Sequence, residues 1–219
     1  MQVSSQQPGQ QRSLFALTIA GALFLPSCSR EPPPPAPHPP GAPVAQAPRR
    51  AAPGPGTRIH RQGAGVPDET GWCLARSTEG GFSVRLPAAF NDSTVTSPAD
   101  GGAFVSTYLL GTTTDTGARF AAFKAQRSDG RINVVSPEAI ADRFEREGKL
   151  RTRRPIVHDG LDGIEFEVED QGQREVFRCF LQDGAIYQLS VQGSKADYDA
   201  GVEALEDRFF ESFRAVALP

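Results

Sequence analysis

Residues 163–182, GIEFEVEDQGQREVFRCFLQ, decide the fold predicted for this chain. Apolar and acidic residues alternate up to the DQGQ turn, and apolar residues return after it, which predicts two antiparallel strands joined by a short polar loop. In this register the hairpin places charges opposite each other on its solvent side, where they stabilise the strand pair: Glu165 faces Arg178 and Glu169 faces Arg174. The buried face then carries Ile164, Phe166, Phe177 and Cys179.

Segments on both sides of this hairpin show related patterns. They predict further strands at residues 82–86, 103–110, 118–126, 156–157 and 186–191. Ser136 and Pro137 are typical of a helix N-terminus, and Gly148 is typical of a helix end. A second helix follows Ser194, with apolar residues at steps of three and four: Tyr198, Val202, Leu205, Phe209 and Phe213. The order of elements predicts an α+β domain on a largely antiparallel sheet.

Five phrases of the sequence together resemble the Mog1/PsbP-like fold: GGFSVRLP, DGLDGIEFEVE, REVFRCFL, GAIYQLSV and the closing FFESF. The resemblance covers roughly residues 71–216. More narrowly, the same phrases are similar to uncharacterised bacterial envelope lipoproteins that carry this domain. It implies an α/β/α sandwich around an antiparallel sheet. It also implies a binding or assembly-accessory role, and it brings no catalytic residue to this chain.

Residues 1–27 have the pattern of a secretory signal peptide. A single Arg precedes an apolar run, and the run ends in small residues. This run is shorter than the roughly 20 apolar residues that a membrane-spanning helix needs. We therefore expect the segment to direct export and to be removed.

The end of this segment resembles the bacterial lipoprotein signal, in which the first residue of the mature chain is a lipid-bearing Cys. Leu25, Ser27 and Cys28 fit the pattern, whereas Pro26 stands where a small or hydroxyl residue is usual. We expect palmitate on Cys28 and hence attachment to a membrane. Ser29 implies the outer membrane in those bacteria that sort lipoproteins by this residue.

Residues 28–65 are dominated by Pro, Ala, Gly and Arg, and they predict a disordered, extended linker. Residues 66–219 then form a single folded domain of ordinary size. Residues 71–219 carry 17 Lys and Arg against 23 Asp and Glu. This acidic balance argues against a nucleic-acid partner, because phosphate binding requires a basic face.

Cys73 and Cys179 remain if Cys28 carries a lipid. In an oxidising compartment the two could form a disulfide, which would close a long loop. The alternative is two buried free thiols that never meet. Their separation in sequence does not decide between the two.

The sequence offers few groups for chemistry. It has no phosphate-binding loop, no HExxH, no CxxC and no GxSxG, so we expect neither an enzyme nor a bound cofactor or metal. His158 is interpreted as structural or exposed. The strip Glu165, Glu167 and Glu169 is interpreted as a solvated face rather than a calcium site. One basic cluster, in a predicted loop, could contact an anion or could be ordinary exposed surface: Lys149, Arg151, Arg153 and Arg154.

These observations predict a lipoprotein of the bacterial cell envelope, held at the membrane by its lipid, whose domain is a non-catalytic protein-binding or assembly module. Its expected partners are other envelope proteins. The alternative is a carrier of a small molecule or lipid in a pocket between sheet and helix. A protein-binding module should expose apolar side chains, whereas a carrier should contain a sizeable apolar cavity.

Overall fold

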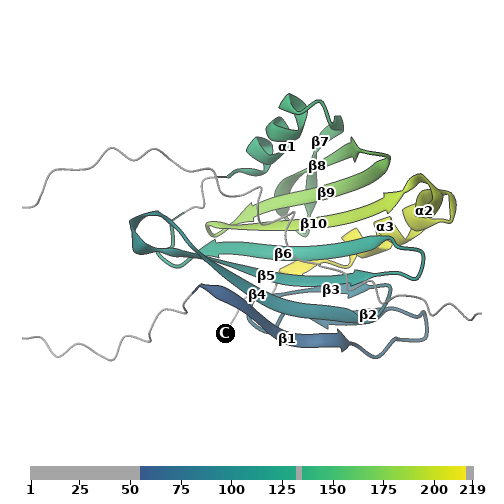
Figure 1. Ribbon diagram of the computed structural model, residues 1–219, viewed down its shortest axis with the longest axis horizontal. Coiled ribbons are helices and arrows are strands. Elements are labelled where there is room, and N and C mark those ends of the chain that lie inside the picture. The colour runs from purple at the N-terminus through teal and green to yellow at the C-terminus, as the bar shows by residue number, and fades with distance from the viewer. Residues whose placement is uncertain (1–54, 132–134, 216–219) are drawn as a thin grey trace, which may run out of the picture. The chain divides into compact units, whose positions relative to one another are not determined.

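The computed structural model describes residues 55–131 and 135–215. The predicted signal peptide, Cys28 and the linker up to residue 54 lie outside these residues. Eight strands form one antiparallel sheet in the spatial order β1-β4-β5-β6-β10-β9-β8-β7 (Figure 1). Three shorter strands form a second antiparallel sheet in the order β11-β3-β2.

The strands of the large sheet are β1 (Gly56–Ala64), β4 (Phe90–Pro98), β5 (Phe104–Thr113), β6 (Arg119–Arg127), β7 (Leu150–His158), β8 (Leu161–Asp170), β9 (Gln173–Gln182) and β10 (Ala185–Ser194). Those of the small sheet are β2 (Cys73–Arg76), β3 (Phe82–Leu86) and β11 (Arg214–Ala215). The helices are α1 (Pro137–Arg146), α2 (Lys195–Asp199) and α3 (Val202–Glu211), with a short 3₁₀ turn at Asp100–Gly102.

Helix α1 packs on one face of the large sheet, against β7, β8 and β9. Its Ala141 belongs to an apolar cluster with side chains of β8 and β9: Ile164, Phe166, Val168, Phe177 and Cys179. Phe144 of α1 adds ring contacts, with its centroid 5.6 Å from that of Phe177 and 5.9 Å from that of Phe166. The buried face predicted for the hairpin is therefore confirmed.

The opposite face of the large sheet packs on α3 and on the small sheet. Side chains alternate along a strand, so Val176 and Phe180 of β9 point away from α1 and into this second cluster. The cluster is rich in aromatic residues: Trp72, Phe82, Phe90, Phe120, Phe180, Phe209, Phe210 and Phe213. It is the larger of the two apolar clusters, and it contains the apolar stripe predicted for the last helix.

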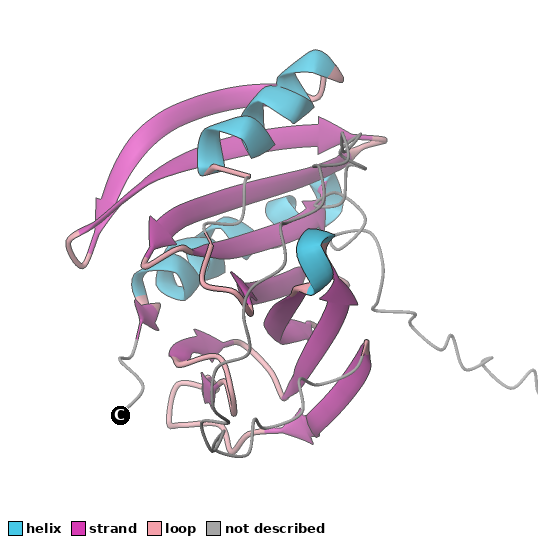
Figure 2. Ribbon diagram, turned by 90° about the vertical axis from the view of Figure 1, so that its left-hand side faces the viewer, coloured by secondary structure: helices cyan, strands magenta, loops and turns pink. Residues whose placement is uncertain are grey.

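The α/β/α sandwich implied by the family resemblance is wrong for this domain. Helices lie on both sides of the sheet, but each covers only a part of it (Figure 2). Helix α1 contacts the strands at one end of the sheet, and much of the other face packs on the small sheet instead of on a helical layer. The domain is mostly antiparallel sheet with few helices.

The predicted pairing of the hairpin is confirmed, with these residues opposite each other: Glu165 and Arg178, and Glu169 and Arg174. The prediction that the first pair lies on the solvent side is wrong. Glu165 and Arg178 form an ion pair of 2.8 Å, and their side chains are only 15% and 13% exposed. The cause is α3, because Arg178 also pairs with Glu211 and lies over the ring of Phe210.

Both predicted helix starts are confirmed. The Ser136 hydroxyl accepts a hydrogen bond of 3.2 Å from the backbone N–H of Ala139, and Ser194 forms a reciprocal capping box with Asp197. The second helix is not continuous, however. It divides into α2 and α3 at Gly201, whose φ of 99° lies in the left-handed region that favours glycine.

The predicted boundary between linker and domain is wrong, because β1 lies inside the predicted linker, 28–65. Strand β1 pairs with β4 through its backbone. It lacks a buried apolar face, and its one large apolar residue, Ile59, is 64% exposed. A polar contact between Arg61 and Asp92 joins β1 to β4 instead. Apolar periodicity therefore gives no signal for this strand.

Strands β1 and β7 form the two edges of the large sheet. The pairing of β1 with β4 shifts between Ile59 and Arg61, and again between Arg61 and Ala64. Strand β7 contains Pro155, which has no N–H, and three arginines: Arg151, Arg153 and Arg154. Neither edge presents a regular, uncharged row of backbone groups.

Candidate binding sites

A recess of about 230 Å³ opens where β6 and β9 begin and β10 ends. Its lining residues are Gly117, Arg119, Gln173 and Gln192. Gln192 of β10 lies opposite Arg119 of β6 on one side and opposite Glu175 of β9 on the other. Gln173 precedes Glu175 by two residues and therefore points to the same face. The recess thus brings together a guanidinium and two amides, with a carboxyl beside them.

Glu175 is partly buried beside this recess. Burial raises the pKa of its carboxyl to about 7, although a hydrogen bond with Ser190 and the charge of Arg119 oppose this shift. Ser190 itself is only 4% exposed. The Glu175 carboxyl forms no ion pair with a described residue, since Arg119 acts on it only through its charge. It is therefore a partly buried acid without a salt-bridge partner in the described structure.

Arg119 differs from the other arginines of β6, β7 and β9. Within residues 55–131 and 135–215, each of the others forms an ion pair with a carboxylate: Arg127, Arg151, Arg153, Arg154, Arg174 and Arg178. Arg119 forms none with these residues, and its side chain is exposed at the recess. Its guanidinium donors are therefore available to a ligand.

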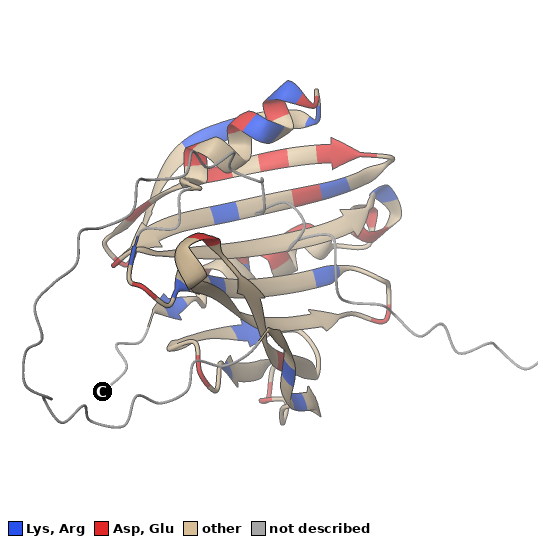
Figure 3. Ribbon diagram, turned by 60° about the vertical axis from the view of Figure 1, so that its left-hand side comes forward, with Lys and Arg blue, Asp and Glu red and all other residues tan. Residues whose placement is uncertain are grey.

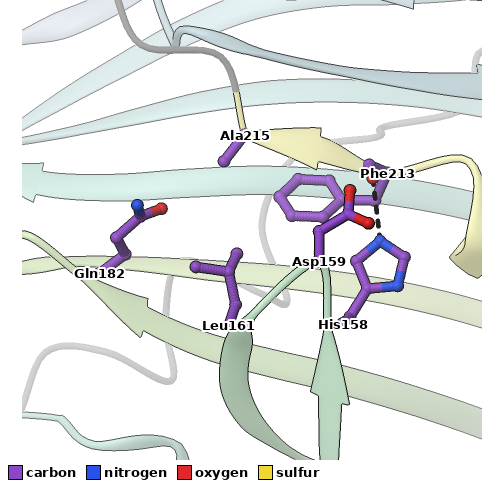
Figure 4. A pocket seen from close by; sticks show the side chains of 6 residues that line it. All are labelled: His158, Asp159, Leu161, Gln182, Phe213 and Ala215. Atoms are coloured by element: carbon purple, nitrogen blue, oxygen red, sulfur yellow. Dashed lines mark hydrogen bonds between the residues drawn. The ribbon is translucent and has the colours of Figure 1, made fainter.

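A second recess, of about 100 Å³, lies between the β7–β8 turn and the C-terminal strand β11 (Figure 4). The buried His158 points its Nε2 at the backbone carbonyl of Phe213 and donates a hydrogen bond of 2.9 Å to it. The His158 ring also lies 6.0 Å from the rings of both Phe180 and Phe213. These contacts give His158 a structural role, in agreement with its interpretation from the sequence.

The predicted basic cluster is not in a loop, because three of its residues lie on β7 and the fourth just before it. Each cation is paired with a carboxylate: Lys149 with Glu147 and Asp170, Arg151 with Glu169, Arg153 with Asp142, and Arg154 with Glu165. Basic and acidic residues are accordingly mixed along α1 and the strands beside it (Figure 3). This arrangement leaves no group of unpaired cations at these positions and does not favour the predicted anion contact.

The acidic strip on β8 is neutralised in the same way. Glu165, Glu167 and Glu169 each pair with at least one arginine of β7 or β9. In the part of the chain that the structure describes, no group of three or more His, Cys, Asp or Glu side chains could hold a metal ion. The strip therefore joins three strands through ion pairs.

Cys73 and Cys179 are both buried free cysteines, so the possible disulfide is not formed in this structure. They belong to different apolar clusters. Cys73, on the small sheet, packs in the aromatic cluster, whereas Cys179 lies on the other side of the large sheet, under α1. Of the two alternatives left open by the sequence, the structure has the separate buried thiols.

A polar cluster that the sequence did not predict joins β1 and β4 to the turn between β2 and β3. Asp92 of β4 is fully buried, and its Oδ2 accepts hydrogen bonds from the Arg61 side chain and from the backbone and hydroxyl of Thr78. Its Oδ1 is buried without a hydrogen-bond partner in the described structure. Nearby, Thr94 donates a hydrogen bond of 2.9 Å to Glu79.

Arg119, Glu175 and Asp92 were all missed as site residues. A signal did exist for Glu175, because in the predicted hairpin it shares the buried face with Phe177 and Cys179. An acid on a buried face indicates either a partner or a raised pKa. Arg119 and Asp92 gave no such signal, since their surroundings depend on which strands become neighbours.

No protein-family model matches this chain, and no curated protein matches it. Its structure is similar to the solution structure of cyanobacterial PsbP from Synechocystis sp. PCC 6803, with a TM-score of 0.39 and 14% identity, covering 71% of this chain and 96% of that one. It is also similar to the crystal structure of a Pseudomonas aeruginosa protein of unknown function, titled a putative regulator, with a TM-score of 0.30 and 16% identity, covering 68% and 98%.

A cyanobacterial PsbP protein is thus among the solved structures to which this chain is similar, at a TM-score of 0.39. The narrower resemblance to envelope lipoproteins stays a prediction. No helix among the described residues is long and apolar enough to cross a membrane.

Proposed function

We propose that this chain is a lipoprotein of the bacterial cell envelope, held at the membrane by a lipid on Cys28, and that its domain binds other envelope proteins without catalysing a reaction. The sequence of residues 12–28 supports the anchor. One structural observation carries the binding role. Helix α1 covers its face of the sheet incompletely and leaves apolar side chains exposed beside it.

Val157 and Leu181 are these side chains, and they are 71% and 40% exposed. Leu181 follows Cys179 by two residues, so it points to the face that α1 covers. Val157 follows Pro155 by two residues, and Pro155 lies opposite the buried Ile164 of the α1 cluster. Both side chains therefore lie on the α1 face, near the end of the strands where α1 no longer covers them. A contiguous apolar patch on a protein surface is typical of a contact with another protein, and we take these two side chains as part of one.

The carrier alternative has less support. The two recesses described above have volumes of about 230 and 100 Å³, below the usual range of roughly 300–1,000 Å³ for ligand pockets. The larger recess is lined mainly by polar side chains of β6, β9 and β10, and no helix residue lines it. A lipid would need an apolar cavity instead.

Site-specific photo-crosslinking in the producing cells tests the binding role. A photoreactive residue at position 157 or 181 should give a discrete cross-linked species that contains a second protein. Position 203 is the matched control, because Glu203 is exposed on α3, on the opposite face. Identical products from all three positions, or none from 157 and 181, would overturn the binding role for this face.

Metabolic labelling with an alkyne analogue of palmitate tests the anchor separately. The wild-type chain should take up the label, and Cys28→Ser should lose it and leave the membrane fraction. Cys179→Ser serves as the control, because a buried thiol should not be acylated. Equal labelling of wild type and Cys28→Ser would exclude the proposed lipid site.

A further inference from the structure

We propose that the recess at Arg119 binds a small zwitterionic molecule of the amino-acid class, with the ligand carboxylate on Arg119 and its ammonium group on Glu175. This site goes beyond the proposed protein-binding role and does not depend on it. It lies at the end of the large sheet where β6, β9 and β10 meet, among residues to which the sequence analysis gave no function.

The strand register sets the two charges on either side of an amide. Arg119, Gln192 and Glu175 occupy directly opposite positions on β6, β10 and β9. Neighbouring strands lie about 4.8 Å apart, so the backbones at Arg119 and Glu175 are on the order of 10 Å apart. That separation leaves room for a small ligand above Gln192, with the long side chains of Arg119 and Glu175 at its two ends.

Both charged groups lack an ion-pair partner among the described residues. Arg119 forms no salt bridge there, and Glu175 has only a hydrogen bond with Ser190 and the charge of Arg119, which is not in an ion pair with it. A guanidinium favours a carboxylate, because its planar N–H groups match the two oxygens. The partly buried Glu175 would gain from a cation, and its raised pKa is consistent with the lack of a paired one. A zwitterion supplies both missing partners at once.

The remaining lining fits a ligand of this size and polarity. Gln173 and Gln192 each offer N–H donors and a carbonyl acceptor. Gly117 lines the recess without a side chain, and a Cβ built there would meet nothing within 4 Å, so the entrance is open. The volume of about 230 Å³ suits a molecule smaller than the usual drug-sized ligand.

Titration of the full-length, ¹⁵N-labelled chain with L-alanine, followed by NMR, tests the proposal. Alanine should shift the side-chain NH₂ signals of Gln173 and Gln192 saturably. N-acetyl-L-alanine lacks the ammonium group, and L-alaninamide lacks the carboxylate. Each analogue should bind at least about tenfold more weakly, since each loses one charge-assisted contact.

Two variants assign the contacts. Arg119→Gln and Glu175→Gln should each weaken alanine binding at least about tenfold. Arg119→Gln should also bind alaninamide as well as it binds alanine, because the carboxylate contact is gone. Glu175→Gln should likewise bind the acetylated analogue as well as it binds alanine, because the ammonium contact is gone. Arg146→Gln, at an exposed position on α1 outside the recess, is the control and should bind as wild type. The proposal is overturned if alanine gives no saturable shift, if either analogue binds as well as alanine, or if Arg119→Gln binds unchanged.

Discussion

Glu175 and Glu206 lie in surroundings that favour their protonated forms. Burial is the main cause for both, and it raises the pKa of each carboxyl from 4.5 to about 7. The charge of Arg174 and a hydrogen bond of 3.1 Å from the Tyr198 hydroxyl oppose the shift at Glu206 without removing it. In the unfolded chain both groups return to ordinary values.

This difference gives a pH dependence with a definite sign. Between pH 4.5 and about 7 the folded chain binds more protons than the unfolded chain at these two groups, so the free energy of unfolding falls as pH rises through that window. Carboxyl groups with a lowered pKa have the opposite effect. Asp129 has a pKa of about 2 instead of 3.8, so the free energy of unfolding decreases as pH falls below 3.8. We therefore expect maximal stability between about pH 4 and 5.

Glu175→Gln tests this expectation in urea denaturation at several pH values. The variant should reduce the loss of stability between about pH 5 and 7, and it should be more stable than wild type at pH 8 by on the order of 1–3 kcal/mol. Glu203→Gln, on the exposed side of α3, is the matched control. A wild-type profile that is flat through this range would contradict the raised pKa values.

Asp92 connects two sheets through a single carboxylate oxygen. Its Oδ2 accepts hydrogen bonds from Arg61 on β1 and from Thr78 after β2, and Asp92 itself is fully buried on β4. Removing the carboxylate takes the shared acceptor away from the donors of Arg61 and Thr78 at once, which costs more than one ordinary hydrogen bond. The cost should appear as lower stability and not as a local effect on β1 alone.

We expect Asp92→Ala to lower the free energy of unfolding by about 2–3 kcal/mol, measured by urea denaturation. Asp92→Asn, which keeps one acceptor oxygen, should lose less. Asp115→Ala is a suitable control, because Asp115 is an exposed loop residue. Equal stability of Asp92→Ala and Asp115→Ala would show that the cluster does not stabilise the fold.

At the scale of single elements, the break between α2 and α3 depends on the backbone of Gly201. Glycine adopts a φ of 99° without strain, and other residues do not. A Cβ atom at this position would meet nothing within 4 Å, so there is space for a side chain. The effect of a substitution is therefore one of backbone conformation and not of packing. Gly201→Ala should destabilise the domain by about 1–2 kcal/mol in urea denaturation.

Ala200→Gly, one residue earlier, is the control for this prediction. Ala200 has a φ of −84°, so glycine there adds only conformational freedom and should cost less than 1 kcal/mol or so. If Gly201→Ala were as stable as wild type, the expected backbone strain at this position would be contradicted.

Elements with apolar alternation were predictable from the sequence, and elements held by polar groups were not. The hairpin of β8 and β9, and strands β3, β5, β6 and β10, follow from period-two patterns. Strand β4 was missed because its core-facing positions after Phe90 are polar: Asp92, Thr94 and Thr96. Strand β1 was missed because it is held by backbone pairing and by Arg61 rather than by apolar burial.

At the scale of the whole molecule, the order of the strands in the sheet could not be predicted from the sequence. Strand β6 pairs with β10, although a helix and three strands lie between them in the sequence. That pairing creates the recess at Arg119 and places Glu175 beside it, so neither could be read from local periodicity. The two free cysteines have the same origin, because Cys73 and Cys179 come to lie in different apolar clusters only once both sheets are assembled.

The cysteines give a prediction for the intact chain. Mass spectrometry of the exported protein should give the same mass with and without reductant, apart from any effect at Cys28. Thiol alkylation should modify Cys73 and Cys179 only after unfolding, because both are fully buried. A mass that rises on reduction, with Cys28 replaced by Ser, would instead establish a bond between the two.

The interrupted edges of the large sheet should limit aggregation of this protein when its local concentration is high. Chains tethered to one membrane meet each other far more often than chains in free solution, because the tether raises their local concentration. An open strand edge would then let one sheet extend into the next. Pro155 and the arginines of β7, together with the two register shifts of β1, interrupt such growth at both ends. If the chain is tethered as proposed, its domains should therefore remain separate at a surface density at which domains with regular, uncharged edge strands would assemble into fibres.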